Sequence, residues 1–248
     1  MIYLRITAVF LWRVWVYLVA AFCTVTLGVV IYILAFQKND RLTYFFMRLW
    51  ALVLFYGAGF RYSLKFSEKL NKNQNYIIVA NHTSLMDVAL MYIVHPQHPI
   101  VFVGKKELQR YPVFGRIYSK VSILVDRSDR KSREAVYPAV KEKLGEGKNV
   151  VIFAEGTVPD RDVILGKFKD GAFAFSTLWN VPIVVYVVHN LKNMFPFVST
   201  LGYPGKVQVE QLAILRPDGE TIDSMKEKTF KMMFHRLEND KIEFPEIK

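Results

Sequence analysis

The chain has 248 residues, of which 52% are hydrophobic, and its formal net charge is +11 at pH 7. The length suits one sizeable domain with an appendage, and the apolar share is too high for an ordinary soluble protein. The basic charge suits a surface of anionic lipid, because the sequence has no recognisable nucleic-acid-binding module such as a zinc finger. The single cysteine, Cys23, excludes a disulfide within the chain.

The apolar residues are concentrated at the front of the chain. Between residues 6 and 36 the only charged side chain is Arg13, and a helix of this span is about 46 Å long, enough for a membrane. If the second apolar stretch, residues 42–60, also crossed a bilayer, Arg48 would lie near mid-depth at a cost of about 2.5–3.5 kcal/mol. We therefore favour a two-helix hairpin that dips into one leaflet, with Arg41 and Arg48 reaching headgroups, over two full crossings.

After this N-terminal region the pattern changes to short β-branched runs separated by helical stretches. We place the boundary near residues 61–67, with a membrane anchor over 1–63 and a second domain over 64–248. The predicted strands are residues 76–80, 100–103, 122–125, 150–153 and 183–188, followed by an edge strand at 206–212. The predicted helices are residues 84–94, 130–144, 168–179 and 223–238. The spacing between strands leaves room for helical crossovers, which predicts an α/β fold with a largely parallel sheet flanked by helices.

A histidine and a carboxylate lie five positions apart directly after the first predicted strand. Residues 81–87 read Asn-His-Thr-Ser-Leu-Met-Asp, which places His82 where a buried strand opens onto a helix. An imidazole takes a proton from a hydroxyl near neutral pH, and a carboxylate on its other nitrogen fixes the tautomer. Asp87 also fits a capping box with Ser84, in which it only accepts backbone N–H groups; the two roles are compatible because a carboxylate has two oxygens.

Polar residues follow four of the predicted strands. They are His82, then Lys105, then Arg127, then Glu155, Gly156 and Thr157. Because the carboxyl ends of parallel strands meet at one edge of a sheet, we expect these side chains to converge. A histidine, several cations and a glycine-containing turn with N–H groups for an anion together predict a site for a phosphorylated substrate. The histidines of residues 95–98 lack the spacing and further ligands of a zinc site, so we expect no metal.

In these residues the chain resembles the membrane-bound glycerolipid acyltransferases, most closely the bacterial 1-acyl-sn-glycerol-3-phosphate acyltransferases often called PlsC. The matching blocks are Asn-His-x4-Asp at 81–87, Lys-x-Glu-Leu at 105–108, Val-Asp-Arg at 125–127, Phe-Ala-Glu-Gly-Thr-Val at 153–158, Phe-Lys-Asp-Gly-Ala-Phe at 168–173 and Val-Pro-Ile-Val at 181–184. Two positions depart from the family pattern: Ala154 replaces a proline, and Val158 stands where an arginine is common. Arg161, three positions later, is the candidate to reach the same anion.

The resemblance implies that His82 takes the proton of the sn-2 hydroxyl of lysophosphatidic acid, which attacks the carbonyl of an acyl thioester while Asp87 orients the base. Lys105 is the candidate to stabilise charge on the carbonyl oxygen. The residues expected to position the glycerol phosphate are Arg127, Glu155, Gly156, Thr157 and Arg161. Among them, Glu155 is expected to orient a cation or a substrate hydroxyl. The aromatic residues Phe102, Phe114, Phe168 and Phe173 either pack in the core, which we favour, or line an acyl channel.

The resemblance also implies the surroundings of the reaction. The acyl donor is a thioester of acyl carrier protein or of coenzyme A, with no cofactor, metal or nucleic acid, and the expected location is the cytoplasmic side of the inner or cytoplasmic membrane, on anionic lipids. Two alternatives stay open. The chain is an acyltransferase for glycerol-3-phosphate or another lysophospholipid, because sequence blocks separate acceptors poorly, or it is a non-catalytic basic protein that binds membrane lipid.

Overall fold

The computed structural model describes residues 2–240 and contains one mixed sheet. Its strands are β1 (Arg61–Lys65), β2 (Ile77–Ala80), β3 (Ile100–Lys105), β4 (Ser122–Val125), β5 (Asn149–Phe153), β6 (Ile183–His189) and β7 (Lys206–Leu215). They lie in the order β1-β7-β6-β2-β5-β3-β4, and neighbours are parallel except for the antiparallel pair β6 and β7. The predicted α/β fold with a largely parallel sheet is confirmed.

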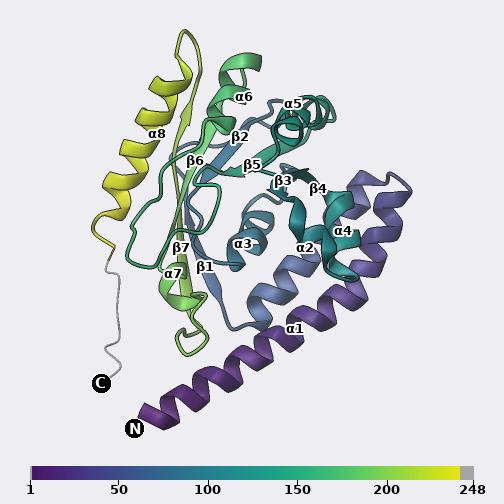
Figure 1. Ribbon diagram of the computed structural model, residues 1–248, viewed down its shortest axis with the longest axis vertical. Coiled ribbons are helices and arrows are strands. Elements are labelled where there is room, and N and C mark those ends of the chain that lie inside the picture. Colours follow the sequence, from purple (N-terminus) through teal and green to yellow (C-terminus); the bar gives the residue numbers. More distant parts are fainter. Residues whose placement is uncertain (1, 241–248) are drawn as a thin grey trace.

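Helices cover both faces of this sheet (Figure 1). They are α1 (Ile2–Phe36), α2 (Asp40–Gly57), α3 (Met86–Val94), the 3-10 helix η1 (Lys106–Arg110), α4 (Phe114–Val121), α5 (Arg130–Gly145), α6 (Gly171–Trp179), α7 (Leu191–Met194) and α8 (Ile222–Leu237). One core cluster joins α2 and α3 to one face of the sheet, and another joins α5, α6 and α8 to the opposite face. Alternate residues of β2 belong to the two clusters, because successive side chains of a strand point to opposite faces.

Several element boundaries differ from the sequence predictions. The helix expected from residue 84 begins at Met86, because the preceding residues form the loop that carries His82, and the helix expected from residue 168 begins at Gly171. Strand β1 is absent from the predictions, although it pairs in parallel with β7 over Arg61–Lys65. The expected domain boundary at residue 63 therefore falls inside a strand of the sheet.

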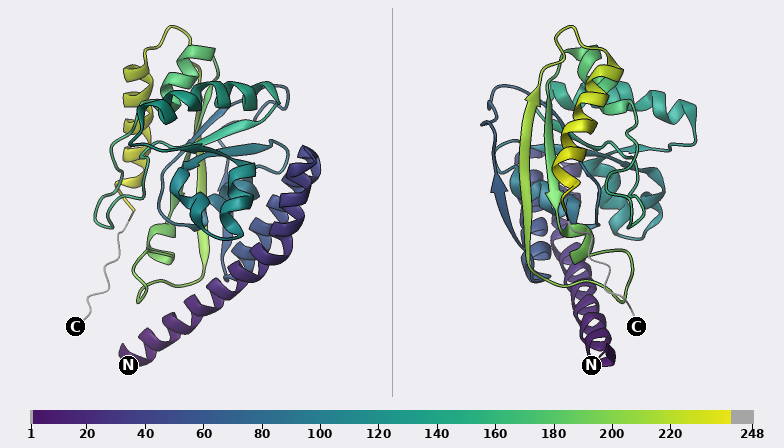
Figure 2. Two further views of the ribbon diagram at one scale, coloured as in Figure 1. Left: turned by 45° about the vertical axis from the view of Figure 1, so that its right-hand side comes forward. Right: turned by 90° about the vertical axis from the view of Figure 1, so that its left-hand side faces the viewer.

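The first helix is long and mostly exposed. Of the described residues, Tyr3–Phe36 is the one helix with the length and composition to cross a membrane, and 17% of its most apolar window is buried. It runs along one side of the domain, and its N-terminal end projects past the sheet (Figure 2). Arg13, one of its two charged residues, is only 3% exposed and donates from Nε to the carbonyl of Leu201 over 3.0 Å. Arg13 thus fixes the helix to the domain.

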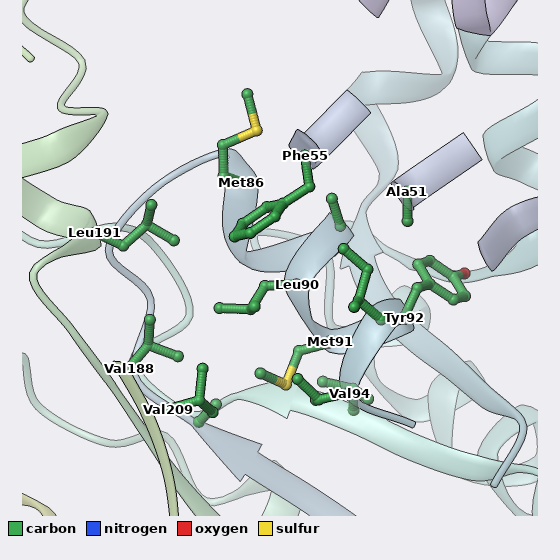
Figure 3. Packing of buried hydrophobic residues seen from close by; sticks show 14 of the residues in the cluster. Ala51, Phe55, Met86, Leu90, Met91, Tyr92, Val94, Val188, Leu191 and Val209 are labelled. Atoms are coloured by element: carbon green, nitrogen blue, oxygen red, sulfur yellow. The ribbon is translucent and has the colours of Figure 1, made fainter. Parts of the chain in front are cut away.

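The second helix does not have the position that we expect from its hydropathy. Its buried residues Thr43, Met47, Ala51, Leu54 and Phe55 recur every three to four positions and form a stripe that faces α3. Figure 3 shows Ala51 and Phe55 on one side of α3 and Val188 and Val209 of the sheet on the other. The core, and not lipid, takes this apolar face.

Arg48 illustrates the same correction. Its Nε donates to the carbonyl of Tyr92 in α3 over 3.2 Å, so Arg48 has a polar partner within the protein and does not depend on lipid headgroups for one. The carbonyl supplies the polar partner that the sequence alone does not reveal. The described residues therefore contain one apolar helix of membrane length in place of the predicted pair.

Candidate active site

His82 and Asp87 form a hydrogen-bonded pair at the point where β2 passes into α3. His82 Nδ1 donates to Asp87 Oδ2 over 2.8 Å. The His82 side chain is 20% exposed, whereas the Asp87 side chain is 0% exposed. Because a carboxylate accepts the Nδ1 proton, the lone pair of the imidazole is on Nε2, the nitrogen that a base uses.

The Asp87 carboxylate also accepts several hydrogen bonds from the loop between β2 and α3. Its Oδ2 accepts the backbone N–H groups of Thr83 over 2.6 Å and Ser84 over 2.9 Å, and its Oδ1 accepts the Thr83 hydroxyl over 3.0 Å. The contact with the Ser84 N–H is one half of a capping box. The same carboxylate therefore makes the capping contact and the contact with the imidazole.

Glu155, which follows β5, fixes the backbone of this loop from the other side. Its Oε1 accepts the His82 N–H over 2.7 Å and its Oε2 accepts the Gly166 N–H over 2.6 Å. The sequence suggests that Glu155 orients a cation or a substrate hydroxyl, but backbone donors occupy both oxygens. Burial raises the pKa of Glu155, and these two N–H groups act in the opposite direction. Glu155 is thus a positioning residue for His82.

Two further contacts set the direction of the histidine ring. The Asn81 side chain donates to the carbonyl of Val188 over 2.9 Å and accepts the Val188 N–H over 2.8 Å, which fixes the loop to β6. The His82 ring stacks on Phe153 with centroids 4.2 Å apart and an interplanar angle of 8°. The imidazole is consequently held before any substrate arrives.

The strand order places the remaining candidates beside His82. Strands β2, β5, β3 and β4 are successive neighbours, so their carboxyl ends bring the loops of Glu155, Lys105 and Arg127 to one edge. The Lys105 side chain is 55% exposed, and its Nζ lies 3.8 Å from Glu107 Oε1. Partial burial lowers the pKa of the Arg127 guanidinium.

All predicted site residues except Asp87 line one cavity of about 1540 Å³. The polar residues gather at the strand ends, and the apolar wall comes from α1 to α4 together with β3. Representative apolar residues of this wall are Ile31, Trp50, Leu54, Val88, Phe102 and Ile117. Phe102 and Phe114 line the cavity, in contrast to Phe168 and Phe173, which stack on each other with centroids 6.0 Å apart.

The glycine-containing turn differs from the expectation in one respect. Gly156 has φ +78°, a left-handed conformation that favours glycine, and its N–H donates to the carbonyl of Phe153 over 2.9 Å. This N–H is engaged within the turn, so it is not among the N–H groups that the turn offers to an anion. Thr157 and Arg161 lie on the cavity wall, as does Val158.

Two cavity lysines are missing from the sequence predictions. Lys169 lies in the block Phe-Lys-Asp-Gly-Ala-Phe, which is itself a signal, but it follows no strand. Lys192 lines the cavity from α7, and its Nζ donates to the carbonyls of Asp160 and Val163, which ties the loop after Thr157 to that helix. Within residues 2–240, no group of three or more His, Cys, Asp or Glu residues is arranged to hold a metal ion.

Comparison with known proteins places this geometry in context. Residues 61–189 match the family model described as Acyltransferase. The chain is 32% identical over 143 residues to a 1-acyl-sn-glycerol-3-phosphate acyltransferase of Helicobacter pylori, covering 57% of this chain and 60% of the relative. It is 34% identical over 157 residues to the protein of the same name from Salmonella typhimurium, covering 56% and 62%. The chain thus spans roughly three fifths of the length of these relatives.

A solved structure has the same fold. The crystal structure of the 1-acyl-sn-glycerophosphate acyltransferase PlsC from Thermotoga maritima superposes with a TM-score of 0.78 at 20% sequence identity, covering 99% of this chain and 100% of that one. At this identity the likeness concerns the fold alone, and it includes the N-terminal helices as well as the sheet.

Proposed function

This chain belongs to the acyltransferase family, and on that premise we propose that it transfers a fatty acyl group from a thioester to the sn-2 hydroxyl of lysophosphatidic acid. The product is phosphatidic acid, a precursor in phospholipid synthesis. The observation that carries the proposal is the His82–Asp87 pair beside an apolar cavity of about 1540 Å³. The names of the relatives support lysophosphatidic acid as the acceptor.

His82 acts as the general base in a single transfer step. Its Nε2 takes the proton of the acceptor hydroxyl while the oxygen attacks the thioester carbonyl carbon. The C–S bond then breaks, and the imidazolium returns its proton to the departing sulfur, which leaves as a free thiol. Asp87 stabilises the imidazolium through the 2.8 Å contact, so no covalent acyl-enzyme is required.

The negative charge that develops on the carbonyl oxygen requires a donor nearby. Lys105 is the last residue of β3 and lines the same cavity as His82, so we assign it this role. The acyl chain occupies the apolar part of the cavity, which excludes water and favours transfer over hydrolysis. The acyl donor is a thioester of acyl carrier protein or of coenzyme A, and no metal or further cofactor takes part.

An acceptor panel tests this function. Purified full chain receives an acyl thioester with lysophosphatidic acid, glycerol-3-phosphate or another lysophospholipid, and mass spectrometry identifies the lipid product. We expect phosphatidic acid and free thiol from the wild type and from His235→Ala, a control because His235 is exposed on α8. A product only from glycerol-3-phosphate, or from another lysophospholipid, would transfer the proposal to that acceptor. Lipid binding without any product would favour the non-catalytic alternative.

The enzyme takes its lipid substrates from the membrane through α1, with the catalytic domain on the cytoplasmic face of the inner or cytoplasmic membrane. The exposed apolar residues Leu11, Leu18 and Phe22 support contact with lipid. Replacing all three by lysine should release the protein from vesicles of anionic lipid in a flotation assay, because each charge is costly at membrane depth. Leu178→Lys, at an exposed apolar position on α6, is the control. Full retention of the triple variant would exclude α1 as the anchor.

A further inference from the structure

We propose that Asp240, which follows α8, is a positioning residue for the transfer reaction. Through His189 it fixes the end of β6, on which the loop of residues 81–85, here called the His82 loop, rests. The inference deepens the function proposed above and rests on it. It assigns a role to a second histidine–carboxylate pair, which lies outside the motif blocks of the sequence.

The His189–Asp240 pair joins the end of α8 to the sheet. His189, the last residue of β6, is 5% exposed, and its Nδ1 lies 2.8 Å from Asp240 Oδ1 and 2.7 Å from Asp240 Oδ2. Among residues 2–240, the Nε2 of His189 is buried without a hydrogen-bond partner. Because a carboxylate only accepts, Nδ1 is the donor, and the contact with Asp240 supplies the hydrogen bond of this buried ring.

The His82 loop rests on the segment that begins where β6 ends. We call residues 188–195, from the end of β6 through α7, the support segment. The Asn81 side chain donates to the carbonyl of Val188 over 2.9 Å and accepts its N–H over 2.8 Å. Ser84 Oγ donates to the carbonyl of Phe195 over 2.8 Å. These contacts attach the loop on both sides of the imidazole that we assign as the base.

The support segment turns sharply directly after His189. Asn190 has φ +65°, a left-handed conformation in which the chain leaves the strand and enters α7. For a residue other than glycine, such a conformation persists where the surrounding structure holds it. The bond from His189 to Asp240 holds the residue before this turn. Lys192, within the segment, also fixes the loop after Thr157, so a displacement of the segment would affect two walls of the site.

Asp240 lies close to the His82 loop but away from the substrate. A small cavity of about 40 Å³ is lined by Asn81 and Thr83 of the loop and by Val188 and Asp240. The large cavity that contains His82 has no Asp240 in its lining. Asp240 therefore acts on the reaction through the loop and touches no reacting atom.

A second contact between α8 and the sheet provides the matched control. Arg236 Nε lies 2.5 Å from Glu210 Oε2, and Arg236 Nη2 lies 2.6 Å from Glu210 Oε1. This ion pair joins the same helix to β7, the neighbour of β6, and no residue of β7 lines the large cavity. Loss of either contact weakens the attachment of α8, but only the His189–Asp240 pair adjoins the His82 loop.

The test compares Asp240→Ala with Arg236→Gln in the purified full chain. Thiol release from an acyl thioester with lysophosphatidic acid is measured at a temperature at which both variants are folded. We expect Asp240→Ala to lower kcat about tenfold with little change in the acceptor KM, because a small displacement of a base lowers the rate. Asp240→Asn keeps an acceptor for His189 Nδ1 and should restore most of kcat, and Arg236→Gln should keep the wild-type kcat. His189→Phe keeps a ring without the donor and should match Asp240→Ala.

Amide hydrogen exchange of residues 81–87, followed by mass spectrometry, gives a second readout that needs no turnover. We expect faster exchange in Asp240→Ala than in the wild type, and wild-type exchange in Arg236→Gln. A wild-type kcat in Asp240→Ala, or an equal loss of kcat in Asp240→Ala and Arg236→Gln, would overturn the proposal. If the wild type releases no thiol, the proposed reaction fails, while the exchange data still decide whether Asp240 holds the loop.

Discussion

The site has an inner wall, formed by the buried carboxylates of Asp87 and Glu155, and an outer rim, formed by cations such as Lys105. The two differ in how far their polar groups are already hydrogen-bonded within the protein. On the inner wall, Asp87 is completely buried and Glu155 is 4% exposed, and every oxygen of these carboxylates accepts a hydrogen bond from the His82 loop or its neighbours. On the rim, the Lys105 side chain is 55% exposed, and its nearest carboxylate lies at 3.8 Å. The inner wall is thus already hydrogen-bonded within the protein, whereas Lys105 on the rim is left largely open to solvent.

This contrast predicts the largest effect at Asp87. Asp87→Asn keeps the size and one carbonyl oxygen but removes the negative charge that faces His82 Nδ1. We expect kcat to fall by about 10³-fold, because the imidazole loses its orientation and the imidazolium its partner. Steady-state thiol release measures the effect, with thermal unfolding as the check that the fold persists. A loss below about tenfold would place Asp87 among purely structural caps.

Glu155 should have the next largest effect although it touches no reacting atom. In Glu155→Gln an amide nitrogen replaces one oxygen, so either the His82 N–H or the Gly166 N–H loses its acceptor. A small displacement of His82 lowers the rate, and we expect kcat to fall about 10²-fold with little change in the acceptor KM. If instead the KM rises while kcat is preserved, Glu155 belongs to the substrate-binding rim.

His95, directly after α3, is a buried histidine that does not line the cavity with His82, so it should affect stability and not the reaction. Its side chain is buried, its Nδ1 donates to the carbonyl of Met91 over 2.9 Å, and burial lowers its pKa from 6.5 to about 4. Between pH 6.5 and pH 4 the unfolded chain binds a proton at His95 and the folded chain does not. The contribution of His95 to the free energy of unfolding is therefore unreduced above pH 6.5 and becomes less favourable as the pH falls. From pH 7 to pH 5 the loss amounts to about 2 kcal/mol.

His95→Asn should remove this pH dependence, because the asparagine amide can still donate to Met91. Urea unfolding at both pH values measures it, and the thiol-release rate at pH 7 should stay near that of the wild type. An equal pH dependence in wild type and His95→Asn would show that another group titrates. A large drop in rate would show that the contrast between the inner wall and the rest of the core is false.

The sequence predicts the parts of the fold that depend on local patterns. Runs such as residues 76–80 are apolar because β2 is buried on both faces, and the strand-end rule brings His82, Lys105 and Arg127 together. Hydropathy does not distinguish a helix face that contacts lipid from one that contacts the protein core. The sequence analysis therefore assigns α2 to the membrane, although its apolar face packs on α3. Arg48 of α2, like Arg13 of α1, donates to a carbonyl that is distant in the chain.

The missed parts of the site depend on contacts between distant segments. The backbone of His82 meets the Glu155 carboxylate across a separation of 73 residues, and no pattern in either segment reveals this contact. Lys169 lies at the cavity because its segment pairs with Ala154, outside any strand end. The positions of charged side chains in loops therefore require the structure, although their presence in motif blocks is visible in the sequence.

The most direct test of the account is thiol release by His82→Ala under conditions in which its binding of lysophosphatidic acid is measured on the same sample. We expect binding to persist and the transfer rate to fall to the uncatalysed level, because the base is gone while the cavity remains. A variant that binds the acceptor and releases thiol at the wild-type rate would contradict the assignment of His82 as the base.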